Sequence, residues 1–317
     1  MPIPPRATAS CHVVHIILES RRMSDPQRWT VKKLLEWTIG FFTRKKVDPA
    51  RLSAELLLAH VLAAPRIKLY LDFERVLTDK QLTDFRELVR RASEQEPIAY
   101  LTGRAHFFNL EFEVTRDVLI PRPDTETLVE NVLQLCRRTI GFESPRILDL
   151  CTGSGCIAAA IAHHNKNATL VATEISPAAA LVAKKNFERL GLSDRITLLQ
   201  GDLFEPLKEL VDQHPFDLIV SNPPYIATAQ IESLDRSVRD YEPLGALDGG
   251  LDGLQFHRRI FSASPARLRS GGRLMLEIAF DQSEPAQLVA AEHADFEQIT
   301  LLKDYAGNER VLAAVRK

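Results

Sequence analysis

Four consecutive residues, Asn222-Pro223-Pro224-Tyr225, combine the groups needed to hold a planar NH2 group. A residue before proline is pushed toward extended backbone and proline has no N–H, so this stretch offers mainly carbonyl oxygens. The Asn222 side chain and the Pro223 main chain supply two acceptors for two hydrogens. Tyr225 adds an aromatic face. We predict a clamp in which all four residues bind substrate and Asn222, Pro223 and Tyr225 are catalytic.

Chemistry at such a nitrogen depends on positioning. An amide nitrogen is a poor nucleophile because its lone pair is delocalised, so holding both hydrogens and aiming the nitrogen at an electrophile is most of the catalysis. No strong base is required, since the alkylated nitrogen loses its proton readily to water. Taken alone, the tetrapeptide also fits a proline-rich turn after the apolar run 216–220.

A second pattern upstream is typical of a nucleotide-cofactor site. The apolar run Arg146–Leu150 predicts a buried parallel strand, followed by the turn Cys151-Thr152-Gly153-Ser154-Gly155 and a helix from Cys156 to Ala162. Gly153 and Gly155 let the backbone approach a ligand. Asp149, at the strand end, is expected to face a cationic amine.

The next two predicted strands end in further candidate ligands. Glu174 closes the run Thr169–Glu174, 19 residues after Gly155, where a carboxylate suits two ribose hydroxyls. The third strand, Ile196–Gln200, leads to Asp202 and Leu203, which could frame an adenine through its amino group and its ring.

The glycine turn alone leaves two reactions open. Residues 153–158 also satisfy the dinucleotide pattern G-x-G-x-x-A, which is typical of a dehydrogenase. Hydride transfer has no use for the clamp, whereas methyl transfer from a sulfonium to nitrogen does. The combination of turn and clamp therefore favours a methyltransferase.

Residues 24–317 resemble the bacterial peptide chain release factor N5-glutamine methyltransferases, which use S-adenosylmethionine. The resemblance extends beyond the clamp to segments 97–103, 119–126, 241–243, 246–250 and 304–307. It implies an α/β fold: a doubly wound, seven-stranded class I methyltransferase sheet with a small N-terminal helical bundle.

The resemblance also implies roles for single residues. The turn Cys151 to Gly155 would wrap the methionine part of the cofactor, and the clamp would bind the substrate glutamine. Two residues depart from the family pattern, because Cys151 stands where Gly is usual and Glu174 where Asp is usual. We expect the Cys151 β-carbon to fit if φ stays negative there. The expected cofactor-binding set is Asp149, Cys151, Thr152, Gly153, Ser154, Gly155, Glu174, Asp202, Leu203 and Asn222.

The elements that must carry these residues divide the chain into four parts. We interpret 1–23 as a disordered extension or an over-called start, 24–97 as a helical partner-docking domain, 98–120 as a β-hairpin linker, and 121–317 as the methyltransferase domain. In the helical part, Asp48-Pro49 predicts a helix start with Leu52, Leu56, Ala59 and Leu62 inward. Thr78 and Gln81 predict a capping box before an apolar stripe at Leu82, Phe85, Leu88 and Ala92.

Four further residues or segments carry open alternatives. Phe107 or Phe108 could close over the cofactor or simply pack, and Arg122 could anchor a carboxylate or form a salt bridge. The polar segment 226–253 is a candidate lid or part of a protein-substrate groove. For Glu277, at the end of the predicted strand 272–278, we expect a structural role.

Composition fits a cytoplasmic enzyme. A net charge of −2 over 317 residues argues against a stand-alone nucleic-acid binder, and no apolar run reaches the roughly 18 residues that span a membrane. Four cysteines without paired spacing are expected to be reduced, and no metal is expected. We expect a monomer.

Three substrates stay open at this point. The first is the glutamine of the Gly-Gly-Gln loop of release factors, and the second is a glutamine of a ribosomal protein. The third is the exocyclic nitrogen of adenine in DNA, which presents the same two hydrogens, although a DNA enzyme also needs a basic groove.

Overall fold

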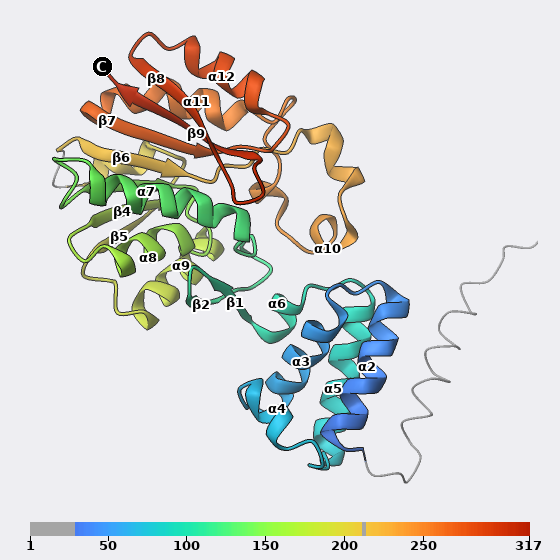
Figure 1. Cartoon of the computed structure of the whole chain (residues 1–317). Coiled ribbons are helices and arrows are strands. Elements are labelled where there is room, and N and C mark those ends of the chain that lie inside the picture. Colours follow the sequence, from blue (N-terminus) through green and yellow to red (C-terminus); the bar gives the residue numbers. More distant parts are fainter. Residues whose placement is uncertain (1–28, 211–213) are drawn as a thin grey trace, which may run out of the picture. The chain divides into compact units, whose positions relative to one another are not determined.

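The computed structural model describes residues 29–210 and 214–317, which fall into two compact units, one that ends at Thr102 and one that begins at Gly103. Each unit is visible in Figure 1, the first in blue to teal and the second in green to red. The division lies between residues 102 and 103, whereas we predicted the helical domain to end at 97. The segment 98–102 is a short helix of the first unit. The prediction for 1–23 lies outside the described residues.

The first unit is a helical bundle around one apolar core. A side-chain cap from Thr30 starts its first described helix, and the predicted capping box of Thr78 and Gln81 is confirmed. Leu82, Phe85 and Ala92 are buried as expected, with Leu88 partly buried. The helices are α2 (Val31–Lys45), α3 (Ala50–Val61), α4 (Ile67–Leu71), α5 (Asp79–Ser93) and α6 (Ile98–Thr102).

The predicted inward face of α3 is only partly right, because Ala59 is buried as expected but Leu52 is not. Leu52 is 37% exposed, while Ala54, Leu57 and Leu58 are fully buried. This helix is apolar on nearly every side, so its periodicity does not single out one face. A buried carboxylate also belongs to the true inner face, since Glu55 is 2% exposed and pairs with arginines of α3 and the following turn.

The second unit begins with the predicted hairpin. Strands β1 (Arg104–Phe107) and β2 (Leu110–Glu113) pair antiparallel. Its side chains belong to the core of this unit, because Phe107 and Phe112 are 1% and 0% exposed and pack edge to face. Asn186 of helix α9 (Pro177–Arg189) accepts from the Glu113 main-chain N–H and donates to the Glu113 carbonyl oxygen. These two hydrogen bonds hold the hairpin to the rest of the second unit.

A seven-stranded sheet forms the centre of this unit, in the order β5-β4-β3-β6-β7-β9-β8. The pairings between β5 and β7 are parallel, and β9 runs antiparallel to both neighbours. The strand order reverses between β3 and β6, and ligands of open α/β sheets bind at such a switch point. Strand β8 was not predicted. The bounds are β3 (Arg146–Leu150), β4 (Thr169–Glu174), β5 (Ile196–Gln200), β6 (Phe216–Ser221), β7 (Leu268–Glu277), β8 (Phe296–Lys303) and β9 (Glu309–Arg316).

Helices cover both faces of the sheet, which makes the fold doubly wound (Figure 1). Alternate strand residues feed the two cores: Ile147 points to the α7, α8 and α9 side, and Leu148 to the α11 and α12 side. The larger helices are α7 (Glu126–Arg138), α8 (Cys156–His164), α9, α11 (Gln255–Ala263) and α12 (Ser283–Ala291). Short helices are η2 (Pro123–Thr125), η3 (Glu205–Glu209), η4 (Thr228–Ser233), α10 (Arg236–Arg239), η5 (Leu244–Ala246) and η6 (Ser264–Ala266).

Candidate active site

A cavity of about 440 Å³ lies at the carboxyl ends of β3, β4, β5 and β6, where the sheet topology predicts a ligand. It brings together most of the predicted site residues. Those that line it are Cys151, Thr152, Gly153, Ser154, Glu174, Asp202, Leu203, Asn222 and Pro224. Asp149, Gly155, Pro223 and Tyr225 are not among the lining residues.

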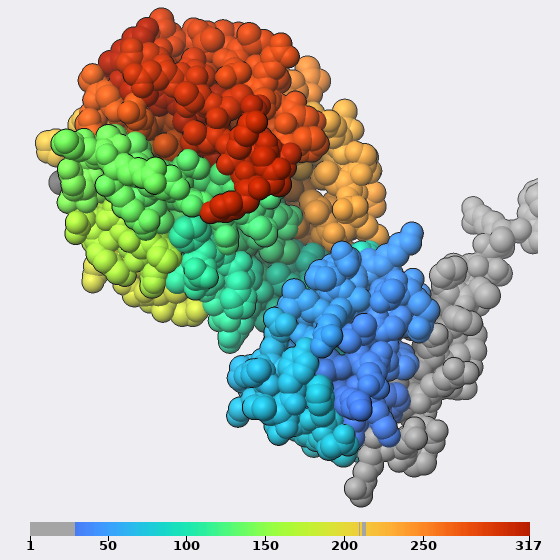
Figure 2. All heavy atoms as spheres, viewed as in Figure 1, coloured from blue at the N-terminus to red at the C-terminus, as the bar shows by residue number. Residues whose placement is uncertain are grey.

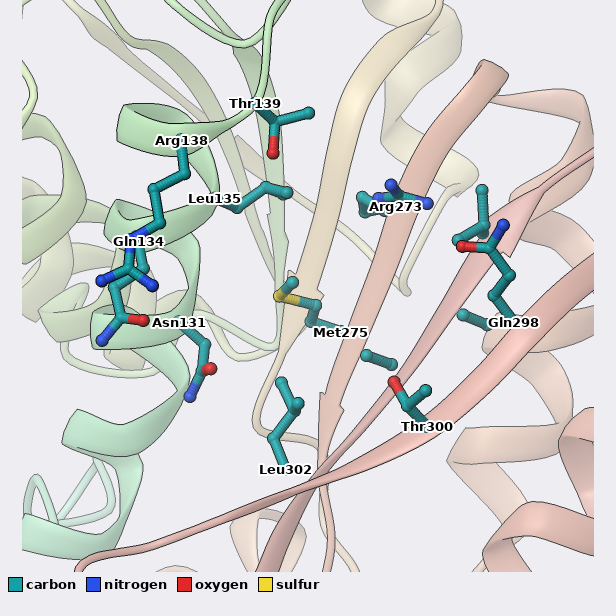
Figure 3. A pocket seen from close by; sticks show the side chains of 13 residues that line it. Asn131, Gln134, Leu135, Arg138, Thr139, Arg273, Met275, Gln298, Thr300 and Leu302 are labelled. Carbon is teal, nitrogen blue, oxygen red and sulfur yellow. The ribbon is translucent and has the colours of Figure 1, made fainter.

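A second hollow, of about 340 Å³, lies over the sheet between α7 and strands β7 to β9 (Figure 3). Gln134 and Arg138 of α7 face Arg273 and Thr300 of the strands across a floor that includes Met275. None of the predicted site residues lines it, so the first cavity is the candidate active site.

The turn after β3 is more strained than we expected. Cys151 has φ +58°, so the condition under which we expected its β-carbon to fit is not met, and a β-carbon stands where glycine is relaxed. Gly155 has φ +80°, and a β-carbon there would lie 2.5 Å from the Phe187 ring. Gly155 therefore allows α8 to start tightly against α9 and has a packing role.

The buried side chain of Asp149 contacts the turn that follows β3. It is fully buried, and the Thr152 hydroxyl donates to its Oδ2 at 2.6 Å. Burial raises the pKa of Asp149 to about 7, against the hydrogen bond from Thr152. Its other oxygen, Oδ1, has no hydrogen-bond partner among the described residues. A direct contact with a cationic amine stays a prediction for this residue.

Glu174 lines the cavity with both carboxylate oxygens held by main-chain N–H groups. Gly153 donates to Oε2 and Ser176 to Oε1, each at 2.9 Å. Burial raises the pKa of Glu174, although both N–H groups oppose this rise. Each oxygen keeps a free lone pair, so the carboxylate can still accept from a diol.

The turn after β5 builds the far end of the cavity. Leu203 has φ +47°, a second strained non-glycine residue at this site, and Arg259 of α11 donates to Asp202 Oδ2 at 2.6 Å. Phe256 lines the cavity with Leu203, and the Arg259 guanidinium lies over the Phe256 ring, 5.7 Å from its centroid. The prediction missed Phe256 and Arg259. Their spacing of three on a helix is the signal that places them on one face.

The clamp presents only part of itself to the cavity. Asn222 and Pro224 line it, whereas Pro223 is buried and Tyr225 lies behind. The Asn222 Nδ2 group donates to Thr125 Oγ1 at 3.1 Å, which leaves Oδ1 as a free acceptor. The Tyr225 hydroxyl donates to Glu277 Oε1 at 3.2 Å, and the Tyr225 carbonyl accepts from Gln282 Nε2 at 2.8 Å.

The segment 226–253 packs directly against the clamp. A β-carbon on Gly249 would lie 2.8 Å from the Pro224 carbonyl oxygen, so only glycine fits there without movement. Pro243, Gly245 and Ala246 of the same segment line the cavity. Figure 2 shows the segment in light orange at the surface of the catalytic unit. These contacts support its predicted role as a cover or a substrate groove.

Arg122, Phe107 and Phe108 make contacts within the second unit. Arg122 forms a salt bridge with Glu242, which is 7% exposed, so the salt-bridge alternative is confirmed. Phe107 is buried in the core, and Phe108 packs against His164. Neither lines the cavity, so closure over the cofactor by these rings is not what the structure shows.

Nucleophilic thiol, metal and membrane roles have no support among the described residues. Burial raises the pKa of Cys156 to about 12 and that of Cys151 still further, so both thiols are protonated near neutral pH. Within 29–210 and 214–317, no group of three or more His, Cys, Asp or Glu side chains could hold a metal ion. In the same part of the chain, no helix has the length and apolarity needed to cross a bilayer.

The fold and the site together define a class I methyltransferase. Family models match residues 33–103 (PrmC N-terminal domain) and 124–236 (Methyltransferase small domain). The chain belongs to the release factor glutamine methyltransferases. It is 44% identical to the enzyme of that name from Rhodopirellula baltica over 92% of this chain and 97% of the relative, and 46% identical to the one from Geobacter sulfurreducens over 82% and 87%.

A solved structure agrees on the fold. The hMettl16 catalytic domain, in complex with MAT2A 3′UTR hairpin 6, aligns with a TM-score of 0.52 over 77% of this chain and 84% of that chain. At 20% identity, this likeness concerns the fold alone. The family membership implies S-adenosylmethionine as the methyl donor, as we predicted.

Proposed function

We propose that this protein methylates the side-chain amide nitrogen (N5) of the glutamine in the Gly-Gly-Gln motif of peptide chain release factors, in translation termination. One observation carries the proposal. The Asn222 side chain, with its nitrogen engaged by Thr125, keeps Oδ1 free as an acceptor at a cavity that also contains the predicted cofactor turn. The names and coverage of the curated relatives support the choice of substrate.

The residues of the cavity fit S-adenosylmethionine. The Glu174 carboxylate has lone pairs for two ribose hydroxyls, and Leu203 and Phe256 offer apolar surface to an adenine. Asp202 can accept from the adenine amino group while it pairs with Arg259. When bound, this cofactor supplies a methyl group on a positively charged sulfur, which leaves as a neutral thioether.

The clamp then holds the nucleophile. Asn222 Oδ1 and the Pro223 carbonyl oxygen accept from the two hydrogens of the glutamine NH2 group, which fixes its plane and aims its lone pair. Both acceptors draw electron density onto the nitrogen as positive charge develops there. The nitrogen gives up one proton to water after it gains the methyl group, so no side chain of the site has to act as a strong base.

We further propose that the helical unit of residues 29–102 docks the protein substrate and that the reaction takes place in the cytoplasm, where release factors act. This unit has a core of its own. On α4 it exposes Ile67 and Leu71, which are 65% and 75% exposed and, four residues apart, share one face of the helix. Exposed apolar side chains that gather in one place are typical of protein contacts.

The test is methyl transfer from labelled S-adenosylmethionine to three substrates: a release factor, a ribosomal protein fraction and adenine-containing DNA. We expect label in the release factor, at the glutamine of Gly-Gly-Gln. A release factor with that glutamine replaced by alanine is the matched control and should stay unlabelled. Label confined to ribosomal protein or to DNA would overturn the proposal.

A further inference from the structure

Two parts of the second unit that both contribute lining residues to the cavity also touch each other. The Arg122 Nη2 group donates to Glu242 Oε1 at 2.5 Å, across 120 positions of sequence. The Arg116 guanidinium lies over the ring of Tyr241, 5.1 Å from its centroid. We call these four residues the latch. Two adjacent residues of one segment are thus each held by an arginine of the other.

The segment 227–246, which we call the covering loop, has its two ends joined to each other. The Ile226 N–H donates to the Leu247 carbonyl oxygen, and the Gly249 N–H donates to the Ile226 carbonyl oxygen. Between these ends the chain forms short helices and no strand, and every residue except Glu242 is at least partly exposed. The buried anchor of the covering loop is therefore a carboxylate and not an apolar side chain.

The charge of this anchor is balanced by the latch. The Glu242 side chain is 1% exposed, and the Arg122 side chain that pairs with it is 32% exposed. Burial raises the pKa of Glu242, while the charge of Arg122 opposes the rise. Glu242 Oε2 has no hydrogen-bond partner among the described residues, so the ionised form depends on Arg122. A buried carboxylate that loses its partner is strongly destabilised, and exposure to water relieves it.

The two sides of the latch differ in their relation to the cavity. Arg122 lines it, whereas Glu242 does not. The loop residues that line the cavity come directly after Glu242 in the chain; they are Pro243, Gly245 and Ala246. The place of Glu242 therefore sets the place of this part of the wall. A substitution at Glu242 can affect a bound cofactor only through the position of the covering loop.

We propose that the latch holds the covering loop over the cofactor and so sets the rates at which S-adenosylmethionine enters the cavity and its demethylated product leaves. The spent cofactor has to leave after each transfer before the next can bind, so loop opening limits how fast the enzyme can turn over. The inference goes beyond the proposed function, because cofactor exchange does not depend on which molecule accepts the methyl group.

The first test removes the arginine. Arg122→Met keeps the aliphatic part of the side chain and leaves Glu242 buried without its partner. Surface plasmon resonance on the immobilised full chain, with S-adenosylmethionine alone, measures both rate constants. We expect association and dissociation to become faster together by about 10- to 100-fold, the range for loss of one charge-linked hydrogen bond, while the dissociation constant stays within about three-fold. A weaker dissociation constant without faster association would instead indicate a direct contact of Arg122 with the cofactor and would overturn the inference.

The second test removes the unpaired charge as well. In the double variant Arg122→Met with Glu242→Gln, no charged group of the pair is left buried, so the covering loop loses its reason to open. Both rate constants should fall back between those of the wild type and those of Arg122→Met. This relief comes from a residue that does not line the cavity. Rates in the double variant that equal or exceed those of Arg122→Met would contradict the latch.

The third test uses the other contact of the latch. Tyr241→Leu keeps an apolar side chain but removes the aromatic face that Arg116 covers. Both rate constants should rise by about 2- to 5-fold, the range for one cation–π contact near the surface. This variant leaves the buried pair intact, so it tests the latch even if Arg122→Met does not fold.

A matched control exists at the other end of the sheet. Arg269 donates to Asp217 of β6, also at 2.5 Å, and neither residue lines the cavity. Arg269→Met should leave both rate constants unchanged. Wild-type rate constants in folded Arg122→Met and Tyr241→Leu would overturn the inference. Failure of the wild-type protein to label any release factor would instead overturn the proposed function and leave the rate constants as they are, so the two failures are distinguishable.

Discussion

The cofactor edge of the cavity, formed by Cys151–Gly155, Glu174 and Asp202–Leu203, is shaped by main-chain turns. The clamp on the other side is shaped by side-chain hydrogen bonds between distant segments. Cys151 and Leu203 take left-handed backbone conformations at the cofactor edge, and N–H groups of Gly153 and Ser176 hold Glu174. At the clamp, Asn222 depends on Thr125, and Tyr225 on Glu277 and Gln282.

This difference predicts that cofactor binding depends on one edge of the cavity and the methyl-transfer step on the other. Main-chain turns give the cofactor edge a fixed shape that most side-chain substitutions leave intact. The clamp has its donors and acceptors set by a few side chains, so one substitution can change its polarity without changing its shape. Substitutions at the two sites should therefore affect different kinetic constants.

The largest expected effect is that of Asn222→Ala. Loss of the acceptor that holds the glutamine NH2 group should lower kcat by about 10³-fold, as for removal of a donor that stabilises developing charge in other enzymes. The dissociation constant of S-adenosylmethionine, measured by calorimetry, should change less than about three-fold. A large loss of cofactor affinity with kcat preserved would place Asn222 at the cofactor edge instead.

Glu174→Gln should have the opposite signature. One of two carboxylate oxygens becomes an NH2 group, which cannot accept from a ribose hydroxyl and faces a main-chain N–H. We expect the dissociation constant of the cofactor to rise by about 10- to 100-fold. At saturating cofactor, kcat should stay within a few-fold of wild type, and a proportional loss of kcat would contradict the separation.

Glu277 predicts opposite effects of pH on activity and stability. Burial raises its pKa to about 7, while Thr125, Arg310 and Tyr225 oppose the rise and Asp124 adds to it; His257 touches only its carbonyl. Since the ionised carboxylate accepts from the hydroxyl of the clamp residue Tyr225, kcat should fall about ten-fold per pH unit below pH 7. Glu277→Gln should lose this acid limb. A limb that persists in the variant would assign it to another group.

The same shift has a sign for folding. The folded state binds this proton more tightly than the unfolded chain, so the contribution of Glu277 to stability is present below about pH 4.5 and is lost as pH rises to about 7. At pH 8, Glu277→Gln should therefore raise the free energy of unfolding by roughly 1 to 3 kcal/mol. Urea unfolding at pH 5 and pH 8 measures the difference. A variant less stable at pH 8 would contradict it.

The smallest expected effect concerns the strained turn. At φ +58°, Cys151→Gly should be more stable than Cys151→Ala by about 1 kcal/mol, because alanine keeps the left-handed strain. Cys156, the first residue of α8, is the matched control: there the glycine variant should be the less stable by about 1 kcal/mol. Thermal unfolding of the four variants measures these differences. Equal stability of the glycine and alanine variants at position 151 would contradict a strained backbone there.

The same contrast explains what the sequence could predict. The predicted cofactor edge follows from local order, since a strand, a glycine turn and a terminal carboxylate are adjacent in the chain, and most of its residues line the cavity, with Gly155 an exception. The contacts of Asn222 with Thr125 and of Tyr225 with Glu277 could not be found this way, because they join residues 97 and 52 positions apart in the sequence. What the prediction missed are contacts between residues that are far apart in the sequence.

The other errors of the sequence-based predictions each have a different physical cause. In α3, apolar residues on nearly every side left the inner face undetermined, and the buried Glu55 reversed the expectation from polarity. At Cys151, the left-handed φ does not follow from the residue type. Phe256 and Arg259 lie on a helix distant from the glycine turn, and only the fold brings them to the cavity.

The free Asn222 oxygen also bears on how each catalytic cycle ends. A glutamine amide carries two N–H hydrogens, but its methylated product carries one. One of the two clamp acceptors is then left without a donor, at a cost of about 1 to 3 kcal/mol. Product should therefore bind about 10- to 100-fold more weakly than substrate, and a second methylation lacks a properly held nitrogen. The acceptor pair thus predicts that the enzyme adds one methyl group to the glutamine and does not add a second.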